Sequence, residues 1–282
     1  MKILFPTDFS NAAENAFVFA LKLANQLKAR ITVLHVYKVP ALSPWSKVSG
    51  RPDEMNDIVT LDEFDHFKSE IDILKRIATE NNLSDIDVNY SLRESDQVVP
   101  AIVGEADESH TDIIIMGTTG ASGIKEMLFG SVASNIMEAA HCPVLLVPES
   151  AYYRGIERIG IGIEYKAEEK DIVNQALAIT KKFGAHLYCF HVKVVDQHKM
   201  KELTNQLHED FENEFDISFH NYYSLDVEKG ILDYCRDEQI DMLVMSVQYK
   251  NRFRELISYN LAKKVAYHIQ IPLLTFHVEP TA

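Results

Sequence analysis

The sequence predicts an α/β fold in which two copies of one unit, residues 1–150 and 151–282, follow each other along the chain. Short apolar runs alternate with segments whose apolar residues recur every three or four positions, as strands and helices do. Alternation of this kind is typical of a parallel sheet covered by helices on both faces. The length of 282 residues and the 46% hydrophobic content suit two ordinary domains.

In the first copy, each apolar run is followed by a segment with helical spacing. The predicted strands are residues 2–7, 31–36, 86–92, 112–116 and 144–147. Ser10 or Asn11 can cap the first helix, whose apolar face extends to Leu27. The later helices carry apolar residues at steps of three and four, at Phe64, Phe67, Ile71, Leu74 and Ala78, around Ile102 and Ala106, and over 132–140.

Two offsets relate the copies. His191 lies 156 residues after His35 in matching contexts, whereas Asp241 follows Asp112 by 129 residues in matching strands. The first copy therefore carries 27 extra residues between these anchors. Prolines and a glycine between Lys38 and Thr60 predict a long loop there, and long loops in compact domains are often functional. A period this long indicates duplicated domains, not a solenoid.

The most distinctive motif is Gly117-Thr-Thr-Gly120, followed after nine residues by Gly130-Ser131. It lies between a predicted strand and a predicted helix. Glycines allow backbone N–H groups to approach an anion, and a helix start adds unpaired donors and a positive dipole end. The Ser131 hydroxyl can cap the helix or bind a phosphate oxygen. The motif predicts a phosphate site, and the alternative is a tight strand–helix connection without a ligand.

This motif resembles that of the ATP-binding members of the universal stress protein family, Gly-x2-Gly-x9-Gly-Ser/Thr, at all four fixed positions. The opening strand that ends in Asp8 and the closing strand after Cys142-Pro143 also resemble that family. The resemblance implies two Rossmann-like domains of the adenine nucleotide alpha hydrolase type. Each would have a five-stranded parallel sheet of order 3-2-1-4-5. The two would pair through their last strands as an intrachain pseudo-dimer.

The resemblance also implies a set of nucleotide-binding residues. Pro6, Thr7 and Asp8 would lie beside ribose and adenine, the Val36 backbone would contact adenine, and the glycine loop would hold the phosphates. The full set is Pro6, Thr7, Asp8, Val36, Met116, Gly117, Thr119, Gly120, Gly130, Ser131 and Val132. The expected ligand is ATP or another adenine nucleotide, with Mg²⁺. Family members often carry an arginine in the loop, where this chain has only Lys125, which implies weaker binding or greater dependence on Mg²⁺.

The second copy lacks the glycine loop. At the offset of 129, Gly117, Gly120, Gly130 and Ser131 correspond to Ser246, Tyr249, Tyr259 and Asn260. Bulky side chains thus replace the open backbone that a phosphate requires. The sequence predicts one nucleotide site per chain, in residues 1–150, with a degenerate second domain.

Composition narrows the function further. A net charge of −14 argues against binding of nucleic acid, which needs a basic surface. Neither an apolar run of about 18 residues nor a secretory leader is evident, and three cysteines without a CxxC pair suit a reducing compartment. We expect a cytoplasmic protein. His35 and His191 are expected to be structural, since no metal-ligand spacing accompanies them.

Two functional hypotheses remain. The first is a nucleotide-dependent sensor or switch that responds to stress and acts on an unknown protein partner. The second is an interaction or chaperone-like stress protein that binds no nucleotide. No catalytic set of residues is evident, so activity is expected to be at most slow ATP hydrolysis or autophosphorylation at Ser131 or Thr119. A homodimer of the tandem chain is compatible with both hypotheses.

Overall fold

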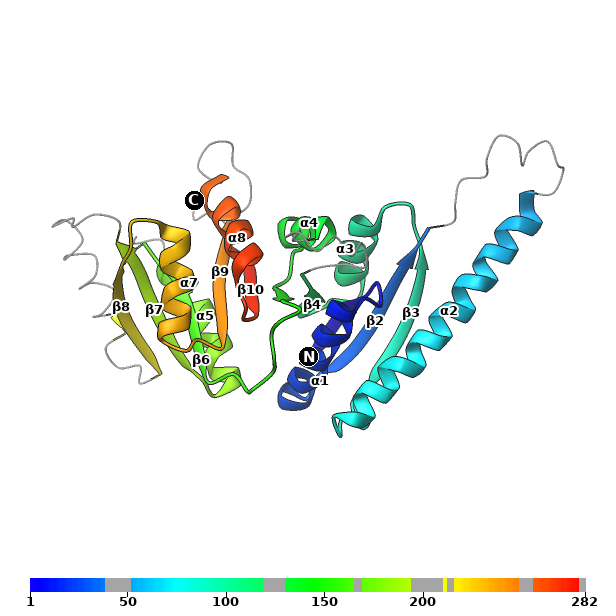
Figure 1. Ribbon diagram of the computed structural model, residues 1–282, viewed down its shortest axis with the longest axis horizontal. Helices are drawn as coiled ribbons and strands as arrows, with labels where there is room; N and C mark the ends of the chain where they lie inside the picture. Colours follow the sequence, from blue (N-terminus) through cyan, green and yellow to red (C-terminus); the bar gives the residue numbers. More distant parts are fainter. Residues whose placement is uncertain are drawn as a thin grey trace.

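The fold, seen in a computed structural model, is one ten-stranded sheet with the strand order β3-β2-β1-β4-β5-β10-β9-β6-β7-β8 (Figure 1). The structure describes residues 1–38, 52–118, 130–164, 169–193, 210–211, 216–248 and 256–278. All pairings are parallel except the one between β5 and β10. Each half therefore has the order 3-2-1-4-5 that the family resemblance implies, which confirms this expectation.

The elements follow one another in the same order in both halves. The strands are β1 Lys2–Pro6, β2 Arg30–Tyr37, β3 Val88–Glu94, β4 Ile113–Gly117, β5 Val144–Val147, β6 Arg158–Gly162, β7 His186–Lys193, β8 Ile217–Tyr223, β9 Met242–Gln248 and β10 Leu273–Val278. The helices are α1 Asn11–Leu27, α2 Pro52–Glu80, α3 Val98–Glu108, α4 Ser131–Ala139, α5 Lys170–Phe183, α7 Val227–Asp237 and α8 Leu256–His268. Ser10 caps α1 by accepting a hydrogen bond from the Ala13 N–H, as the sequence predicts.

The two halves meet through the antiparallel pair β5 and β10. Leu145 lies opposite Leu274, and these residues occupy equivalent positions in the two copies. A pairing in which equivalent residues face each other is the isologous contact of a twofold dimer, here made within one chain. It also removes two sheet edges, since each last strand covers the other.

Hydrogen bonds that fix the strands are repeated in detail. The Thr7 N–H donates to the Leu34 carbonyl over 2.9 Å, and 156 residues later the Ile163 N–H donates to the Phe190 carbonyl over 2.8 Å. By β3 the offset has changed, since Val88 pairs with Ile31 and its counterpart 129 residues on, Ile217, pairs with the counterpart of Ile31. The extra residues of the first copy therefore lie between β2 and β3.

Part of the predicted long loop is helical. Residues 52–60 belong to α2, which starts at Pro52 and runs to Glu80, so the prediction of a loop up to Thr60 is wrong for these residues. Residues 39–51 lie outside the described part of the chain. Proline at the first helical position supplies a preset φ and lacks only an N–H that has no helical partner there. The proline that suggested a loop therefore starts the helix.

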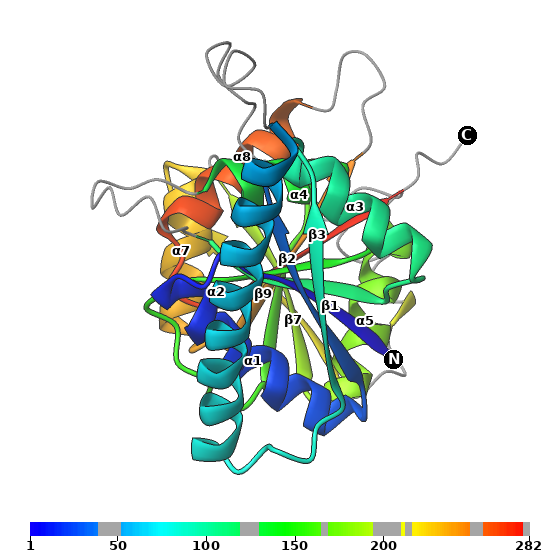
Figure 2. The same cartoon turned by 90° about the vertical axis from the view of Figure 1, so that its right-hand side faces the viewer.

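Two cores lie on the two faces of the sheet. One includes Phe5, Phe17 and Ile31 beneath α1, and it continues without a break to Ile161 and Val173 beside α5. The other lies beneath α3, α4, α7 and α8. Figure 2, seen from the α2 side, shows α1 and α2 on one side of the near strands and α3 on the other. Because both cores cross the β5–β10 junction, the halves share their hydrophobic interior.

Candidate functional site

The candidate site lies where β2, β1 and β4 end side by side. Ile3 pairs with Ile113 in β4, and Pro6 pairs with Leu34 in β2. The segment after β1 is thus flanked by the ends of two neighbouring strands, and ligands of parallel α/β sheets bind at such ends. The structure brings Pro6, Thr7, Val36, Met116 and Gly117 together here. Pro6, Thr7 and Met116 are buried and Val36 is half-buried.

His35 fixes the end of β1. Its Nδ1 lies 2.8 Å from the Thr7 carbonyl oxygen. Because a carbonyl oxygen only accepts hydrogen bonds, Nδ1 carries the proton. His191 makes the same contact with the Ile163 carbonyl over 2.7 Å. Both histidines are therefore structural, as predicted, and among the described residues no group of three or more His, Cys, Asp or Glu gathers to hold a metal ion.

Asp8 is exposed and is held at the start of α1. Its Oδ1 accepts hydrogen bonds from the Ser10 N–H over 3.1 Å and from the Ser10 hydroxyl over 2.7 Å. The Ser10 hydroxyl oxygen in turn accepts from the Ala13 N–H. The carboxylate position is thus linked to the N-cap of α1, so its geometry is set before any ligand arrives.

Phe9 is a site residue that the sequence interpretation missed. Its φ of 57° is left-handed, which is uncommon for a bulky residue and marks local strain. The ring lies 4.8 Å from that of His35 and 6.1 Å from that of Phe67 in α2. This aromatic cluster stabilises the turn that presents Asp8. The helical spacing of Phe67 signalled burial, but a left-handed Phe9 leaves no mark in the sequence.

Gly117 is required by packing. A Cβ atom built on it would lie 3.0 Å from the Ala12 carbonyl oxygen and 3.3 Å from the Ala13 nitrogen. Those are backbone atoms of α1 and cannot rotate away. The glycine therefore allows α1 to approach β4 closely, a different role from exposing an N–H to phosphate.

The base of the glycine loop is closed by two hydrogen bonds. The Thr118 N–H donates to the Val147 carbonyl over 3.1 Å, and the Gly130 N–H donates to the Thr118 carbonyl over 2.7 Å. Gly130 therefore spends its N–H on the loop base. Thr119 and Gly120, together with the rest of residues 119–129, lie outside the described part of the chain.

The start of α4 offers donors toward the loop. Gly130 occupies the N-cap position with an extended ψ of 135°, and its carbonyl accepts the Ser134 N–H. Ser131 is the first helical residue and makes no capping bond, so the prediction that its hydroxyl can cap the helix is wrong. The first-turn N–H groups of Ser131, Val132 and Ala133 have no acceptor inside the helix. The exposed Ser131 hydroxyl lies beside them.

The second copy differs at both features. The Glu164 N–H, at the position equivalent to Asp8, donates to both carboxylate oxygens of Glu169 over 2.8 and 2.9 Å. A carboxylate at this strand end repels phosphate. Helix α8 starts at Leu256, so Tyr259 and Asn260, which correspond to Gly130 and Ser131, lie inside it. Without the glycine the helix extends over the place where α4 begins.

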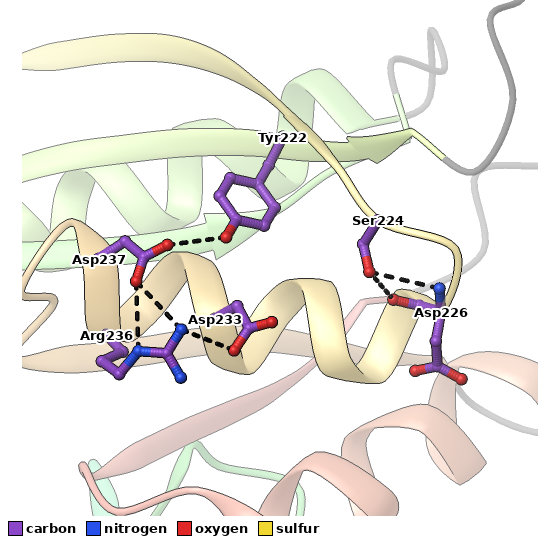
Figure 3. Close-up of polar contacts among 6 residues, drawn as sticks. All are labelled: Tyr222, Ser224, Asp226, Asp233, Arg236 and Asp237. Atoms are coloured by element: carbon purple, nitrogen blue, oxygen red, sulfur yellow. Dashed lines mark hydrogen bonds and ion pairs between the residues drawn. The ribbon is translucent and has the colours of Figure 1, made fainter.

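The outer strand and its helix are also joined differently in the two copies. In the first copy, Arg93 of β3 pairs with Glu105 of α3 over 3.1 Å. In the second, Figure 3 shows Tyr222 of β8 reaching toward α7, where its hydroxyl donates to the Asp237 carboxylate over 2.8 Å. Tyr223 next to it is exposed, with the Lys193 Nζ 5.6 Å from its ring. Tyr222 therefore packs the edge strand, the more ordinary of the two roles open to it.

The cysteines and helices exclude two further chemistries for the described residues. Burial raises the pKa of Cys142 to about 11 and that of Cys235 to about 12, so these thiols are protonated near neutral pH and unreactive. None of the helices in the described ranges is both long and apolar enough to cross a membrane.

Comparisons with known proteins agree with this architecture. The model of the universal stress protein family matches residues 1–148. A universal stress protein of Methanocaldococcus jannaschii is 30% identical over 154 residues, covering 52% of this chain and 81% of the relative. A putative universal stress protein of Staphylococcus aureus is 27% identical over 146 residues, covering 51% and 82%. The crystal structure of a universal stress protein from Archaeoglobus fulgidus covers 98% of both chains with a TM-score of 0.71 at 18% identity.

Proposed function

Because this chain belongs to the universal stress protein family, we propose that residues 1–150 bind one adenine nucleotide, ATP with Mg²⁺, and that residues 151–282 bind none. The observation that carries the proposal is the start of α4 beside the ends of β1 and β4. There, first-turn N–H donors, a serine hydroxyl and an exposed carboxylate surround one end of the sheet.

The proposed binding mode divides the site into two parts. The adenosine would lie against Pro6, Thr7, Asp8 and Val36, with the Asp8 carboxylate accepting hydrogen bonds from ribose hydroxyls. The phosphates would lie against the start of α4. The residues assigned to that second part are Met116, Gly117, Thr119, Gly120, Gly130, Ser131 and Val132. In a chain with a net charge of −14, local N–H donors and Mg²⁺ are the means to hold a polyphosphate.

We propose that the nucleotide acts as a switch in a cytoplasmic stress response. The described contacts supply a route for this. Thr118 at the loop base is bonded to Val147 in β5, and β5 pairs with β10 of the second copy. A ligand that orders the loop would therefore act on the strand that joins the two copies and on the surfaces that a protein partner contacts.

Substitution of Ser131 by Asp tests the phosphate site. A carboxylate in the first turn suits the helix dipole, so the fold is retained, but it repels the phosphates. We expect Ser131→Asp to weaken ATP binding at least about tenfold, a loss of about 1.4 kcal/mol, in calorimetry with Mg²⁺. The matched control is Asn260→Asp, an exposed residue at the equivalent place in α8, which should leave binding unchanged. Equal affinities in both variants would contradict the assignment.

One observation favours the alternative of an interaction protein without a nucleotide. Tyr223, Leu225 and Val227, around the turn from β8 into α7, are 68%, 92% and 37% exposed. Three exposed apolar side chains within five residues suit contact with another protein. Absence of ATP binding in the wild-type protein, together with partner capture that is lost in Leu225→Ser, would favour this function over nucleotide binding.

A further inference from the structure

The geometry points to a second binding site, an apolar pocket between the two copies that takes a small apolar molecule carrying one carboxylate. The pocket has a volume of about 110 Å³. Ile3, Leu27 and Leu145 line it from the first copy, and Ile179, Phe183 and Leu274 line it from the second. Leu145 and Leu274 are the pair that faces itself at the β5–β10 junction. An occupant would therefore contact both copies at once.

The size and lining of the pocket define the body of the ligand. Ile3, Leu145 and Leu274 are each at most 2% exposed, so the inner wall is dry and apolar. Apolar cavities of about 150 Å³ in proteins stay free of water and bind benzene. A pocket of 110 Å³ that opens at one side suits a single aromatic ring or a short branched chain whose polar group remains outside.

The charges at the rim define the polar group. Two charged residues line the pocket, Asp112 and Lys182. The Asp112 carboxylate accepts the Lys2 N–H over 2.7 Å and is thereby committed to the start of β1. Lys182 is exposed, and no described residue forms a hydrogen bond or an ion pair with it. Its ammonium group is the available partner for a carboxylate at the mouth.

The pocket is separate from the candidate nucleotide site. It is lined by the first residues of β1 and β4 and by the last turns of α1 and α5, whereas the nucleotide site lies at the other ends of these strands. The inference therefore does not rest on nucleotide binding, and it stands or fails independently.

Methionine methyl NMR locates an occupant directly. Met242 lines the pocket, whereas Met116 and Met137 belong to the core on the other face of the sheet. Titration of the full chain with phenylacetate should shift the Met242 methyl signal and leave those of Met116 and Met137 in place. Toluene, which has the same ring and no charge, should bind about three- to fivefold more weakly, the contribution of an exposed ion pair.

Two lysine variants test the carboxylate. Lys182→Gln should lower the affinity for phenylacetate to that for toluene, and Lys181→Gln, one residue away on α5, should change neither. Ile179→Trp should fill the pocket and abolish both shifts, with the Met137 signal reporting that the variant is folded. Absence of a Met242 shift with both probes would overturn the proposal. Equal effects of Lys181→Gln and Lys182→Gln would also overturn it, because the ligand would then not be recognised at Lys182.

Discussion

At the scale of single residues, Gly117 shows how packing and binding compete as explanations for one glycine. We expect Gly117→Ala to destabilise the protein by about 1–3 kcal/mol, the usual cost of overpacking, because its Cβ would press on the α1 backbone at Ala12. Urea unfolding measures this directly.

The control for Gly117 is Gly104, in the interior of α3. A Cβ there would meet nothing within 4 Å, so Gly104→Ala should be neutral or stabilising by up to about 1 kcal/mol. Similar unfolding midpoints for Gly117→Ala and the wild type would show that α1 can move away and that packing does not require the glycine.

The candidate site was predictable in place but not in the role of each residue. The spacing of glycines locates the loop, and the family assignment it suggested is confirmed. Yet the Gly117 contact involves Ala12, 105 residues away in the chain, and the Gly130 N–H is taken by Thr118. Both depend on which elements become neighbours in space, and a single sequence does not record this. The assignment of these residues to a nucleotide stays a prediction.

At the scale of elements, the two copies use different chemistry to join the outer strand to its helix. The hydrogen bond from Tyr222, and next to it the Arg236 guanidinium, hold the pKa of Asp237 below its usual range. A lowered carboxyl pKa stabilises the fold above the unfolded value of about 3.9 and is lost as the pH falls through the folded value.

The Tyr222→Phe variant tests this contact. It should lower the urea midpoint at pH 7, and its difference from the wild type should shrink as the pH falls from about 4 toward 2, where Asp237 becomes protonated. Tyr223→Phe, at the exposed neighbouring position, is the control and should show no such pH dependence. A Tyr222→Phe effect of the same size at pH 7 and pH 2 would exclude Asp237 as the partner.

Element types were predicted better than element limits. All five strands of the first copy lie within two residues of their predicted places, since apolar runs between glycines and prolines define buried strands. The main error is α2, where residues 52–60 are helical. The proline and glycine content of residues 38–60 indicated a loop, and the early part of α2 has no clear apolar period to oppose that interpretation.

At the scale of the whole molecule, the fold is a dimer built within one chain. Repeats at two offsets predicted the duplication, and the sheet order confirms the pairing of the last strands. The pocket between the copies was not predictable, because its walls come from strands and helices of both copies whose apolar residues look like ordinary core. The boundary near residue 150 stays a prediction.

That boundary has a testable consequence. A fragment of residues 1–150 would expose β5 as an unpaired edge, so it should form a homodimer through Val144–Val147, with β5 of a second copy in the place of β10. Light scattering after gel filtration measures its mass. Leu145→Lys in the same fragment should yield monomer or unfolded chain. A folded, monomeric wild-type fragment would contradict the domain division.

The central claim is one nucleotide site per chain, and nucleotide release tests it most directly. Freshly purified full-length protein is denatured in acid, and the released nucleotide is identified and counted by chromatography, with Ser131→Asp and Asn260→Asp in parallel. We predict one adenine nucleotide per chain from the wild type and from Asn260→Asp, and a large loss from Ser131→Asp. Two nucleotides per chain, or none even after incubation with ATP and Mg²⁺, would contradict the account.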